Sequence, residues 1–500
     1  MKNSKITFNA LAAILQVIII GVVYLILYRF ILLELGIELL GIWSLVVAST
    51  SALTIANFGV SSSVVKFVSN YYAKNRIDLI NKLIFTSSIF VFVTYFILSI
   101  IVYFVAQQLL GLVIEEKYLE IALKILPFSF ISLLVNTLSG VITSSIDGVQ
   151  KNYIKSIILI FSSFLLLILS FLLTPKYGIF GLVYAQIFQA LFVFFISIIL
   201  LRKIFKNQIH FGWFWDIYIL KEILGYGLKI QASSLLQMTF DPLVKFFLSK
   251  FGGLASVGYY EMAYRLVIQL RGIIVNANQV IVPVIAENQI KKPQNIILIY
   301  KKSFSLILFL NIILITSVIV FVPYISMIWI GHYEKMFVYS VILISIAMFF
   351  NISSNPAYFS YLGEGKLNWI VITNAINFII ILLFGYLLGS YLGKYGVIIA
   401  NSIAIITSAL IILKSFHHYK EIKFKQIFNF SDSKLIITSI ILMVSSNWLF
   451  HTFNENNFSL LSILYTIVSM LFFIYFLFKN LNFNLLSNQL RQILNFKRNN

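Results

Sequence analysis

The chain has 500 residues, of which 60% are hydrophobic, 16% are aromatic and only 11% are charged. Soluble domains contain about 25% charged residues, and a water-soluble chain of this size could not bury so much apolar surface. The composition therefore excludes a soluble enzyme, a disordered regulator and a secreted disulfide scaffold. The absence of cysteine also excludes thiolate metal sites and redox couples.

The net charge is +20, from 37 Lys and Arg residues against 17 Asp and Glu residues. In soluble proteins such a surplus favours nucleic-acid binding. In membrane proteins, by contrast, Lys and Arg gather in the cytoplasmic loops. The sequence therefore predicts a polytopic membrane protein with no nucleic-acid partner.

Continuous apolar runs of ~20 residues, the length that crosses a bilayer as a helix, recur along the whole chain. The runs do not alternate between apolar and polar residues, as the strands of a transmembrane barrel would. The sequence thus predicts an all-α fold with about fourteen transmembrane helices. Their approximate positions are 8–30, 39–60, 82–106, 121–145, 154–174, 178–201, 222–246, 257–284, 303–325, 337–360, 367–389, 395–414, 434–452 and 458–478.

Lys and Arg residues occur mainly in every second loop. When the N-terminus is placed in the cytoplasm, the loops on the opposite side receive only Lys117, Lys176, Lys250, Lys335 and Lys394. This asymmetry predicts a membrane protein with both termini in the cytoplasm. In residues 481–500, apolar side chains recur on one side of a possible helix with basic residues nearby, which predicts an amphipathic helix on the inner leaflet. A frayed tail is the alternative.

Short patterns recur after 215–218 residues. The matching sets are Gly36 and Gly41 with Gly253 and Gly258, Lys176-Tyr177-Gly178 with Lys394-Tyr395-Gly396, and Asn136, Gly148 and Lys151 with Asn351, Gly363 and Lys366. They predict two parallel six-helix repeats, as in many transporters. The predicted domains are 1–206 and 207–415 for the repeats, 416–480 for two additional transmembrane helices, and 481–500 for the cytoplasmic tail.

Charged residues inside apolar spans are costly and are candidates for functional sites. The predicted spans contain the cations Arg29, Lys124, Lys229, Lys245, Arg265 and Arg271, and the carboxylates Asp241 and Glu261. Helical periodicity places Glu261, Arg265, Asn276 and Gln279 on one side of the eighth span, beside Arg271. Such a stripe must face protein or a water-filled cavity, so it predicts a substrate site. We also expect Pro242 to bend the seventh span.

Two structural alternatives remain open. Asp241 and Lys245 are four residues apart, as are Glu261 and Arg265, so that each pair could neutralise itself. Arg29 and Lys124 could instead extend to the outer membrane interface. The first six spans have no convincing buried carboxylate, and the chain has no phosphate-binding Gly-Lys-Ser/Thr loop. The missing carboxylates argue against a cation-coupled drug antiporter, and the missing loop argues against an ATPase activity of its own. We expect no cofactor.

The stretch from Ile42 to Lys74, which contains Asn57-Phe58-Gly59-Val60, resembles the second span and following loop of bacterial polysaccharide flippases. The stretch from Gly225 to Arg265, which contains Asp241-Pro242 and Gly258-Tyr259-Tyr260-Glu261, resembles their spans 7 and 8. These flippases belong to the multidrug/oligosaccharidyl-lipid/polysaccharide exporter superfamily. The resemblance covers nearly the whole chain and implies a V-shaped pair of bundles that opens alternately to each side.

The resemblance implies a transporter, not an enzyme, for surface polysaccharide such as the O-antigen of lipopolysaccharide. Its cargo would be a polyprenyl-diphosphate-linked oligosaccharide, and its partners membrane lipid, a polysaccharide polymerase and a chain-length regulator. Basic residues suit the diphosphate. The expected substrate-binding residues are Arg265, Arg271, Lys245, Lys229, Arg29, Lys124, Asn276 and Gln279, with Asp241 and Glu261 as coupling or counter-ion residues.

Three other functions fit parts of the pattern. A multidrug or cation antiporter would share the fold but would need acidic cavity residues. A flippase for a peptidoglycan precursor shares the diphosphate, and composition does not separate it from the first hypothesis. A membrane glycan polymerase would need a large outside loop, which the hydropathy pattern lacks.

Overall fold

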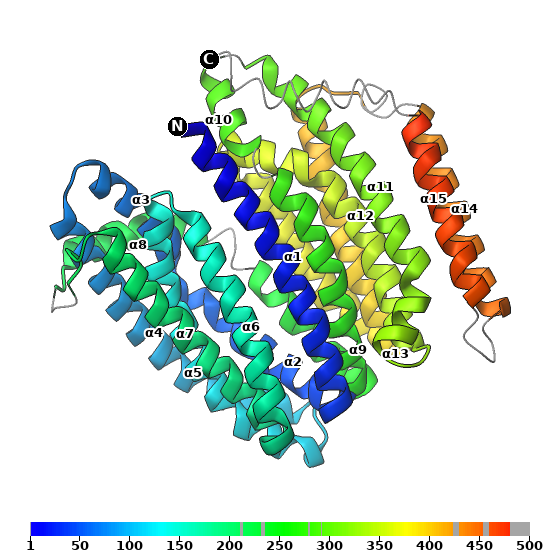
Figure 1. The fold of residues 1–500 in the computed structure, drawn as a ribbon, viewed down its shortest axis with the longest axis horizontal. Coiled ribbons are helices and arrows are strands. Elements are labelled where there is room, and N and C mark those ends of the chain that lie inside the picture. The colour runs from blue at the N-terminus through cyan, green and yellow to red at the C-terminus, as the bar shows by residue number, and fades with distance from the viewer. Residues whose placement is uncertain are drawn as a thin grey trace. The chain divides into compact units, whose positions relative to one another are not determined.

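The structure is a computed structural model that describes residues 2–210, 214–231, 236–278, 281–291, 293–423, 430–453 and 460–480. These segments are mainly helical and contain no β-strand (Figure 1). Their helices are α1 (Lys2–Leu35), α2 (Ile37–Ser51), η1 (Ala52–Asn57), α3 (Val60–Ala73), α4 (Ile77–Gly111), α5 (Glu116–Gly148), α6 (Asn152–Tyr177), α7 (Ile179–Ile204), α8 (Ile217–Gln231), η2 (Gln237–Thr239), α9 (Phe240–Asn278), α10 (Ile281–Lys291), α11 (Asn295–Trp329), α12 (Lys335–Gly363), α13 (Asn368–Tyr419), α14 (Phe430–Phe453) and α15 (Leu460–Asn480).

Within the described segments, nine helices are long and apolar enough to cross a membrane. The prediction of an all-α polytopic membrane protein is confirmed. The 52-residue helix α13 contains two predicted spans, which meet at the non-helical Gly393. Three other predicted spans are interrupted: 39–60 divides into α2 and η1, 222–246 is shared between α8 and α9, and 257–284 runs from α9 into α10.

The bend expected at Pro242 lies elsewhere. Helix α8 ends at Gln231 and α9 begins at Phe240, so Pro242 is the third residue of a new helix. The first four N–H groups of a helix have no intrahelical acceptor, and a proline there loses no hydrogen bond. The helix interruption therefore precedes the proline, and α9 bends instead at Gly253, whose φ is 72°.

The chain forms two compact units. The first comprises Met1–Glu261 with Ile381–Val397, and the second comprises Met262–Ile380 with Ile398–Asn500. Helices α9 and α13 each contribute residues to both units. These units are defined by which residues contact one another, whereas the predicted domains follow the repeat along the sequence. The domain boundaries at 206 and 415 therefore stay a prediction.

Close packing in the first unit depends on small residues. Helix α7 packs against α5 and α6, and α6 packs against α1. On α6, the buried Ser162, Ser163 and Ser170 give little side-chain bulk at the positions that they occupy. A Cβ atom at Gly181 of α7 would overlap the backbone of Leu173 in α6. Small residues allow such close helix approach in membranes, where apolar surface alone does not drive helices together.

In the second unit, aromatic side chains pack helices α11, α12 and α13 together. Tyr300 is fully buried, and its ring lies 4.7 Å from that of Phe416, which also packs against Tyr361. The Tyr300 hydroxyl is 2.6 Å from Nε2 of His417. Helices α14 and α15 pack against each other and against α11 (Figure 1).

The backbone repeats itself where the sequence pattern predicted a repeat. Gly36 and Gly253 both separate helical segments with positive φ, 82° and 72°. Gly148 packs against Val68, as Gly363 does against Ile285, with 2.9 Å from an added Cβ atom to the neighbouring Cβ in both cases. These equivalent contacts support two repeats of the same helical pattern.

One part of the predicted alignment is wrong. The sequence pairs Gly178 with Gly396, but the conformation of Gly178 (φ 58°, ψ −139°) recurs at Gly393 (φ 60°, ψ −143°). Gly396 instead corresponds to Gly181, because both pack against a backbone carbonyl of the preceding helical segment. The shared Lys-Tyr-Gly letters are therefore coincidental, since backbone conformation and packing decide which glycines are equivalent.

Candidate functional site

A charge cluster lies inside the first unit. Lys245 Nζ is 2.6 Å from Asp241 Oδ2 and 2.8 Å from Glu261 Oε2. The Tyr28 hydroxyl donates a hydrogen bond of 2.6 Å to Glu261 Oε1. The side chains of Lys245 and Glu261 are only 3% and 2% exposed, and that of Asp241 is 32% exposed. We call Tyr28, Asp241, Lys245 and Glu261 the Lys245 cluster.

Three helical segments position this cluster. Asp241 and Lys245 lie one turn apart at the start of α9, and Tyr28 lies on α1. Glu261 lies beyond the break at Gly253, so the change of chain direction brings its carboxylate to Lys245. Gly258 allows this part of α9 to lie close to α2, because an added Cβ atom would lie 2.6 Å from the carbonyl oxygen of Ile37.

Charge balance limits what the Lys245 cluster can do. Two carboxylates surround one ammonium group, so the fully ionised cluster carries one negative charge. Buried ions are tolerated when they are paired and hydrogen-bonded. Its two carboxylates are groups that can accept and release a proton.

Arg271 has a different environment in the second unit. Its Nε donates a hydrogen bond of 2.9 Å to Asn351 Oδ1 on α12. Tyr264 and Tyr358 lie close enough to interact with the guanidinium group electrostatically. Among the residues that the structure describes, no carboxylate oxygen lies within 4 Å of Arg271. The guanidinium group is therefore oriented by neutral partners and keeps its charge available.

Buried amides extend the polar character of the second unit. Asn278 Oδ1 accepts a hydrogen bond of 2.6 Å from Ser303. Asn311 Nδ2 donates to the Phe349 carbonyl at 2.7 Å and to Ser353 Oγ at 3.0 Å. These residues and Asn351 were not predicted from the sequence as site residues. A signal was present, because amides are rare in such apolar runs and must be satisfied there.

The remaining sequence candidates differ in burial and in how far the structure describes them. Arg29 on α1 and Arg265 on α9 are half-buried, and Asn276 near the end of α9 is exposed. Lys124 was expected to be buried, but its side chain is 61% exposed and forms a 2.6 Å ion pair with Glu120. The side chain of Lys229 and the whole of Gln279 lie outside the described residues.

A buried ion pair in the second unit was also not predicted from the sequence. Glu364, which follows α12, is 2.5 Å from Lys420 at the end of α13, and their side chains are 2% and 16% exposed. The signal was weak because both residues lie in connections that hydropathy assigns to solvent. The pair joins the ends of two helices, which is a structural role.

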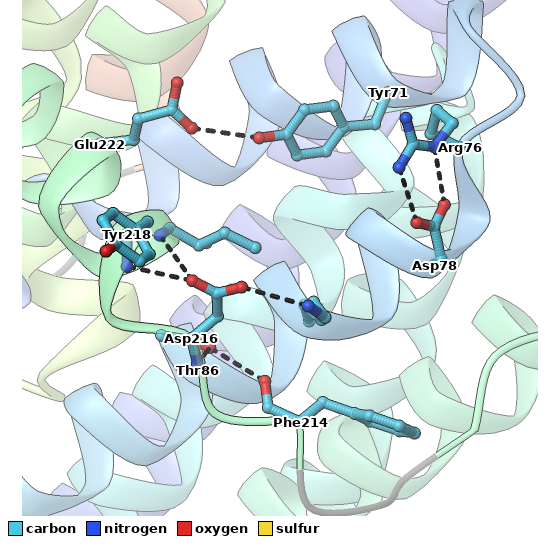
Figure 2. A network of polar contacts seen from close by, with 10 residues as sticks. Tyr71, Arg76, Asp78, Thr86, Phe214, Asp216, Tyr218 and Glu222 are labelled. Carbon is cyan, nitrogen blue, oxygen red and sulfur yellow. Dashed lines mark hydrogen bonds and ion pairs between the residues drawn. The ribbon is translucent and has the colours of Figure 1, made fainter.

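Hydrogen bonds and an ion pair join the residues just before α8 to α4 (Figure 2). Asp216 caps α8 by accepting hydrogen bonds from the backbone N–H groups of Tyr218 (3.0 Å) and Ile219 (3.3 Å). Lys82 Nζ lies 3.2 Å from the same carboxylate, and the Thr86 hydroxyl donates to the Phe214 carbonyl at 3.3 Å. These contacts fix where α8 begins.

A second contact in Figure 2 joins α3 to α8. The Tyr71 hydroxyl donates a hydrogen bond of 3.1 Å to Glu222 Oε2. Burial, followed by the negative charge of Glu222, raises the pKa of Tyr71 to about 12. Tyr71 therefore stays protonated at physiological pH and remains a hydrogen-bond donor.

Replacing Asp216 with alanine is expected to cost about 1 kcal/mol of stability, because an N-cap side chain is lost. The backbone N–H of Ile219, and then Lys82, hold the pKa of Asp216 below its ordinary value of 3.8. The stabilisation is therefore present above that value and is lost as the pH falls through the lower folded-state pKa. Hydrogen exchange of the first turn of α8, measured at several pH values, tests this. Exchange in Asp216→Ala that equals the wild type at neutral pH would contradict the capping role; exposed Asp78→Ala is the control.

Comparison with known proteins gives a family and a fold. The sequence matches the profile of the family described as "Polysaccharide biosynthesis protein" over residues 4–289, more than half of the chain. No curated protein sequence matches the chain. The family match confirms the resemblance inferred from the sequence.

Solved structures of transporters share the fold. The lipid II flippase MurJ, in an inward closed conformation, matches with a TM-score of 0.71 and 18% identity over 95% of this chain and 99% of its own. An inward-facing multidrug resistance MATE family transporter of the MOP superfamily matches at 0.66 and 15%, over 82% and 98%. A MOP superfamily transporter from Pyrococcus furiosus, described as having a binding pocket of reverse polarity, matches at 0.59 and 14%, over 83% and 95%. At these identities the likeness establishes the fold alone.

Proposed function

Because this chain belongs to the Polysaccharide biosynthesis protein family, we propose that it is a flippase for polyprenyl-diphosphate-linked oligosaccharides. It would move these lipids from the cytoplasmic to the outer leaflet of a bacterial inner membrane by alternating access. The product would serve surface polysaccharide synthesis, including O-antigen, together with a polymerase and a chain-length regulator. Both termini would lie in the cytoplasm, as the distribution of Lys and Arg predicts.

The observation that carries this proposal is the environment of Arg271. A diphosphate carries about two negative charges and needs hydrogen-bond donors in place of its hydration shell. The Arg271 guanidinium group is held by the neutral Asn351 and has no carboxylate within 4 Å in the described part of the chain. A planar guanidinium group can donate two parallel hydrogen bonds to phosphate oxygens. Arg265, six residues earlier on α9, is proposed as a second cation for the same headgroup.

The Lys245 cluster is proposed to couple transport to protonation. Protonation of Glu261 or Asp241 would change the cluster from net negative to neutral and would weaken the ion pairs with Lys245. The membrane potential is a second source of free energy for transport. Moving an anionic headgroup away from a negative cytoplasm is favourable by ~2.3 kcal/mol per charge and 100 mV.

The second candidate is a flippase for a lipid-linked peptidoglycan precursor. The match to the lipid II flippase MurJ covers 95% of this chain, whereas the MATE transporter match covers 82%. The diphosphate chemistry proposed for Arg271 would serve either cargo. A cation antiporter is less favoured, because Lys245 already neutralises part of the acidic charge of its cluster.

The test uses the full chain reconstituted into vesicles with polyprenyl-diphosphate-linked oligosaccharide. Transport is the fraction of oligosaccharide that becomes accessible to a membrane-impermeant glycosidase. Parallel vesicles contain the lipid-linked peptidoglycan precursor or a cationic dye, and protein-free vesicles are the control. Movement of the oligosaccharide supports the proposal. Movement of the precursor alone selects the second candidate, and movement of the dye alone overturns both.

A further inference from the structure

Two adjoining cavities in the first unit share the side chain of Lys250. One, of about 440 Å³, is lined by the connection between α4 and α5 and by the bend in α9, including Glu115 and Ser249. The other, of about 510 Å³, lies between the first segment of α9 and the part of α13 that belongs to this unit. The proposed transport function uses neither cavity.

The larger cavity is an apolar groove. Its lining includes Leu243 and Phe246 on α9 and Leu383 and Leu387 on α13. Leu383 and Leu387 are 53% and 48% exposed, so their side chains remain accessible from outside the protein. In a membrane protein, an open groove of this lining fits a hydrocarbon chain.

The packing of α13 against α9 forms the aromatic end of this groove. An added Cβ atom at Gly385 would lie 2.8 Å from the ring of Phe247, and one at Gly389 would lie 2.5 Å from that of Phe251. Glycines at these positions thus let the aromatic rings lie against the α13 backbone. The Lys250 ammonium group lies 5.7 Å from the centre of the Phe251 ring and 5.2 Å from that of Tyr386. Cation–π attraction holds the charge where the two cavities meet.

The smaller cavity offers two opposite charges that do not pair with each other. Glu115 precedes α5 in an extended conformation and lines the cavity with Lys250. Within the described residues, neither side chain has an opposite charge within 4 Å. A ligand that carries both a phosphate and an ammonium group could satisfy Lys250 and Glu115 together. A purely anionic headgroup would meet the repulsion of the Glu115 carboxylate.

We propose that these adjoining cavities bind one aminophospholipid of the phosphatidylethanolamine type. Its acyl chain occupies the apolar groove, its phosphate contacts Lys250 and its ammonium group contacts Glu115. The site combines an apolar groove with a polar cavity, as an amphiphile at a membrane interface requires. Phosphatidylcholine fits less well because its quaternary ammonium group has no N–H to donate to Glu115. Phosphatidylglycerol fits less well because it lacks the cation.

The test measures lipid association in vesicles of phosphatidylcholine that contain the full chain and a trace of spin-labelled phospholipid. The immobilised fraction of the label gives the relative association of phosphatidylethanolamine, phosphatidylcholine and phosphatidylglycerol. We expect phosphatidylethanolamine to associate about two- to fivefold more strongly than the other two, the range of one exposed ion pair. Equal association of all three lipids, or preference for phosphatidylglycerol, overturns the proposal.

Variants test whether the preference for phosphatidylethanolamine depends on these two cavities. Glu115→Gln is expected to abolish the preference for phosphatidylethanolamine over phosphatidylcholine, and Lys250→Gln to weaken association of both. Leu387→Trp fills the groove and is expected to reduce association without regard to headgroup. Lys176→Gln changes an exposed lysine on α6 that lines neither cavity, and it should behave as the wild type. If Glu115→Gln retains the wild-type preference, the proposal is wrong. Oligosaccharide transport by the same preparations reports separately on the proposed function.

Discussion

Replacing Lys245 with alanine is expected to destabilise the protein by about 3–5 kcal/mol, because removal of one partner leaves buried charges uncompensated. The side chains of Lys245 and Glu261 are 3% and 2% exposed, so solvent screens their interaction little. Asp241, at 32% exposed, contributes less. Thermal unfolding of the purified chain in detergent, compared between variants, measures the loss.

A graded series separates charge from packing. Tyr28→Phe removes the hydroxyl that donates to Glu261 and is expected to cost about 1.5–3 kcal/mol, the range for hydrogen bonds to charged groups. The triple variant Asp241→Asn, Lys245→Met, Glu261→Gln removes every charge and should recover most of the stability that Lys245→Ala loses.

The matched control is Lys124→Ala. Lys124 also pairs with a carboxylate four residues away, but the two side chains are 61% and 74% exposed. Exposed helical pairs contribute about 0.3–0.5 kcal/mol. If Lys245→Ala unfolds no more readily than Lys124→Ala, the cluster does not stabilise the fold in the way that its burial predicts.

Hydropathy could predict the helical class and most helix positions, but not where the helices break. The run 39–60 contains no charged residue, yet α2 ends at Ser51, and Phe58 and Gly59 adopt positive φ. An added Cβ atom at Gly59 would overlap the backbone of Gly227, so this break accommodates a close approach between segments far apart in sequence. A local window does not contain that contact.

The same limit applies to the site. Spacing alone predicts the pairing of Asp241 with Lys245, because residues four apart share a helix face. It does not predict that Glu261 joins Lys245, because that contact requires the non-helical Gly253. Asn351 was visible in the sequence only as a marker of the repeat, since its hydrogen bond to Arg271 spans 80 residues.

Replacing Arg271 with alanine is expected to lower transport of the lipid-linked oligosaccharide by about 10- to 100-fold. A hydrogen bond to a charged group contributes about 1.5–3 kcal/mol, and each 1.4 kcal/mol is about a factor of ten in affinity. Initial rates in the glycosidase assay, measured over a range of substrate concentrations, test this. Arg271→Lys keeps the charge but loses the planar pair of donors, so it should transport at an intermediate rate.

Asn351→Ala tests whether orientation matters as well as charge. Asn351 accepts the Nε hydrogen bond at 2.9 Å, so its loss frees the guanidinium group without removing it. We expect a smaller loss of transport than in Arg271→Ala and no further loss when both changes are combined. Full transport by Arg271→Ala would place the headgroup elsewhere.

Stability separates the role of Arg271 from that of Lys245. Lys245 has two carboxylate partners, so its removal leaves these carboxylates without their ammonium partner inside the protein. Arg271 has a neutral hydrogen-bond partner, and its removal leaves Asn351 with an unused acceptor but no unpaired ion. Arg271→Ala should therefore lose transport with little change in thermal unfolding, whereas Lys245→Ala should lose stability first. A large loss of stability in Arg271→Ala would instead indicate that the guanidinium group holds α9 and α12 together.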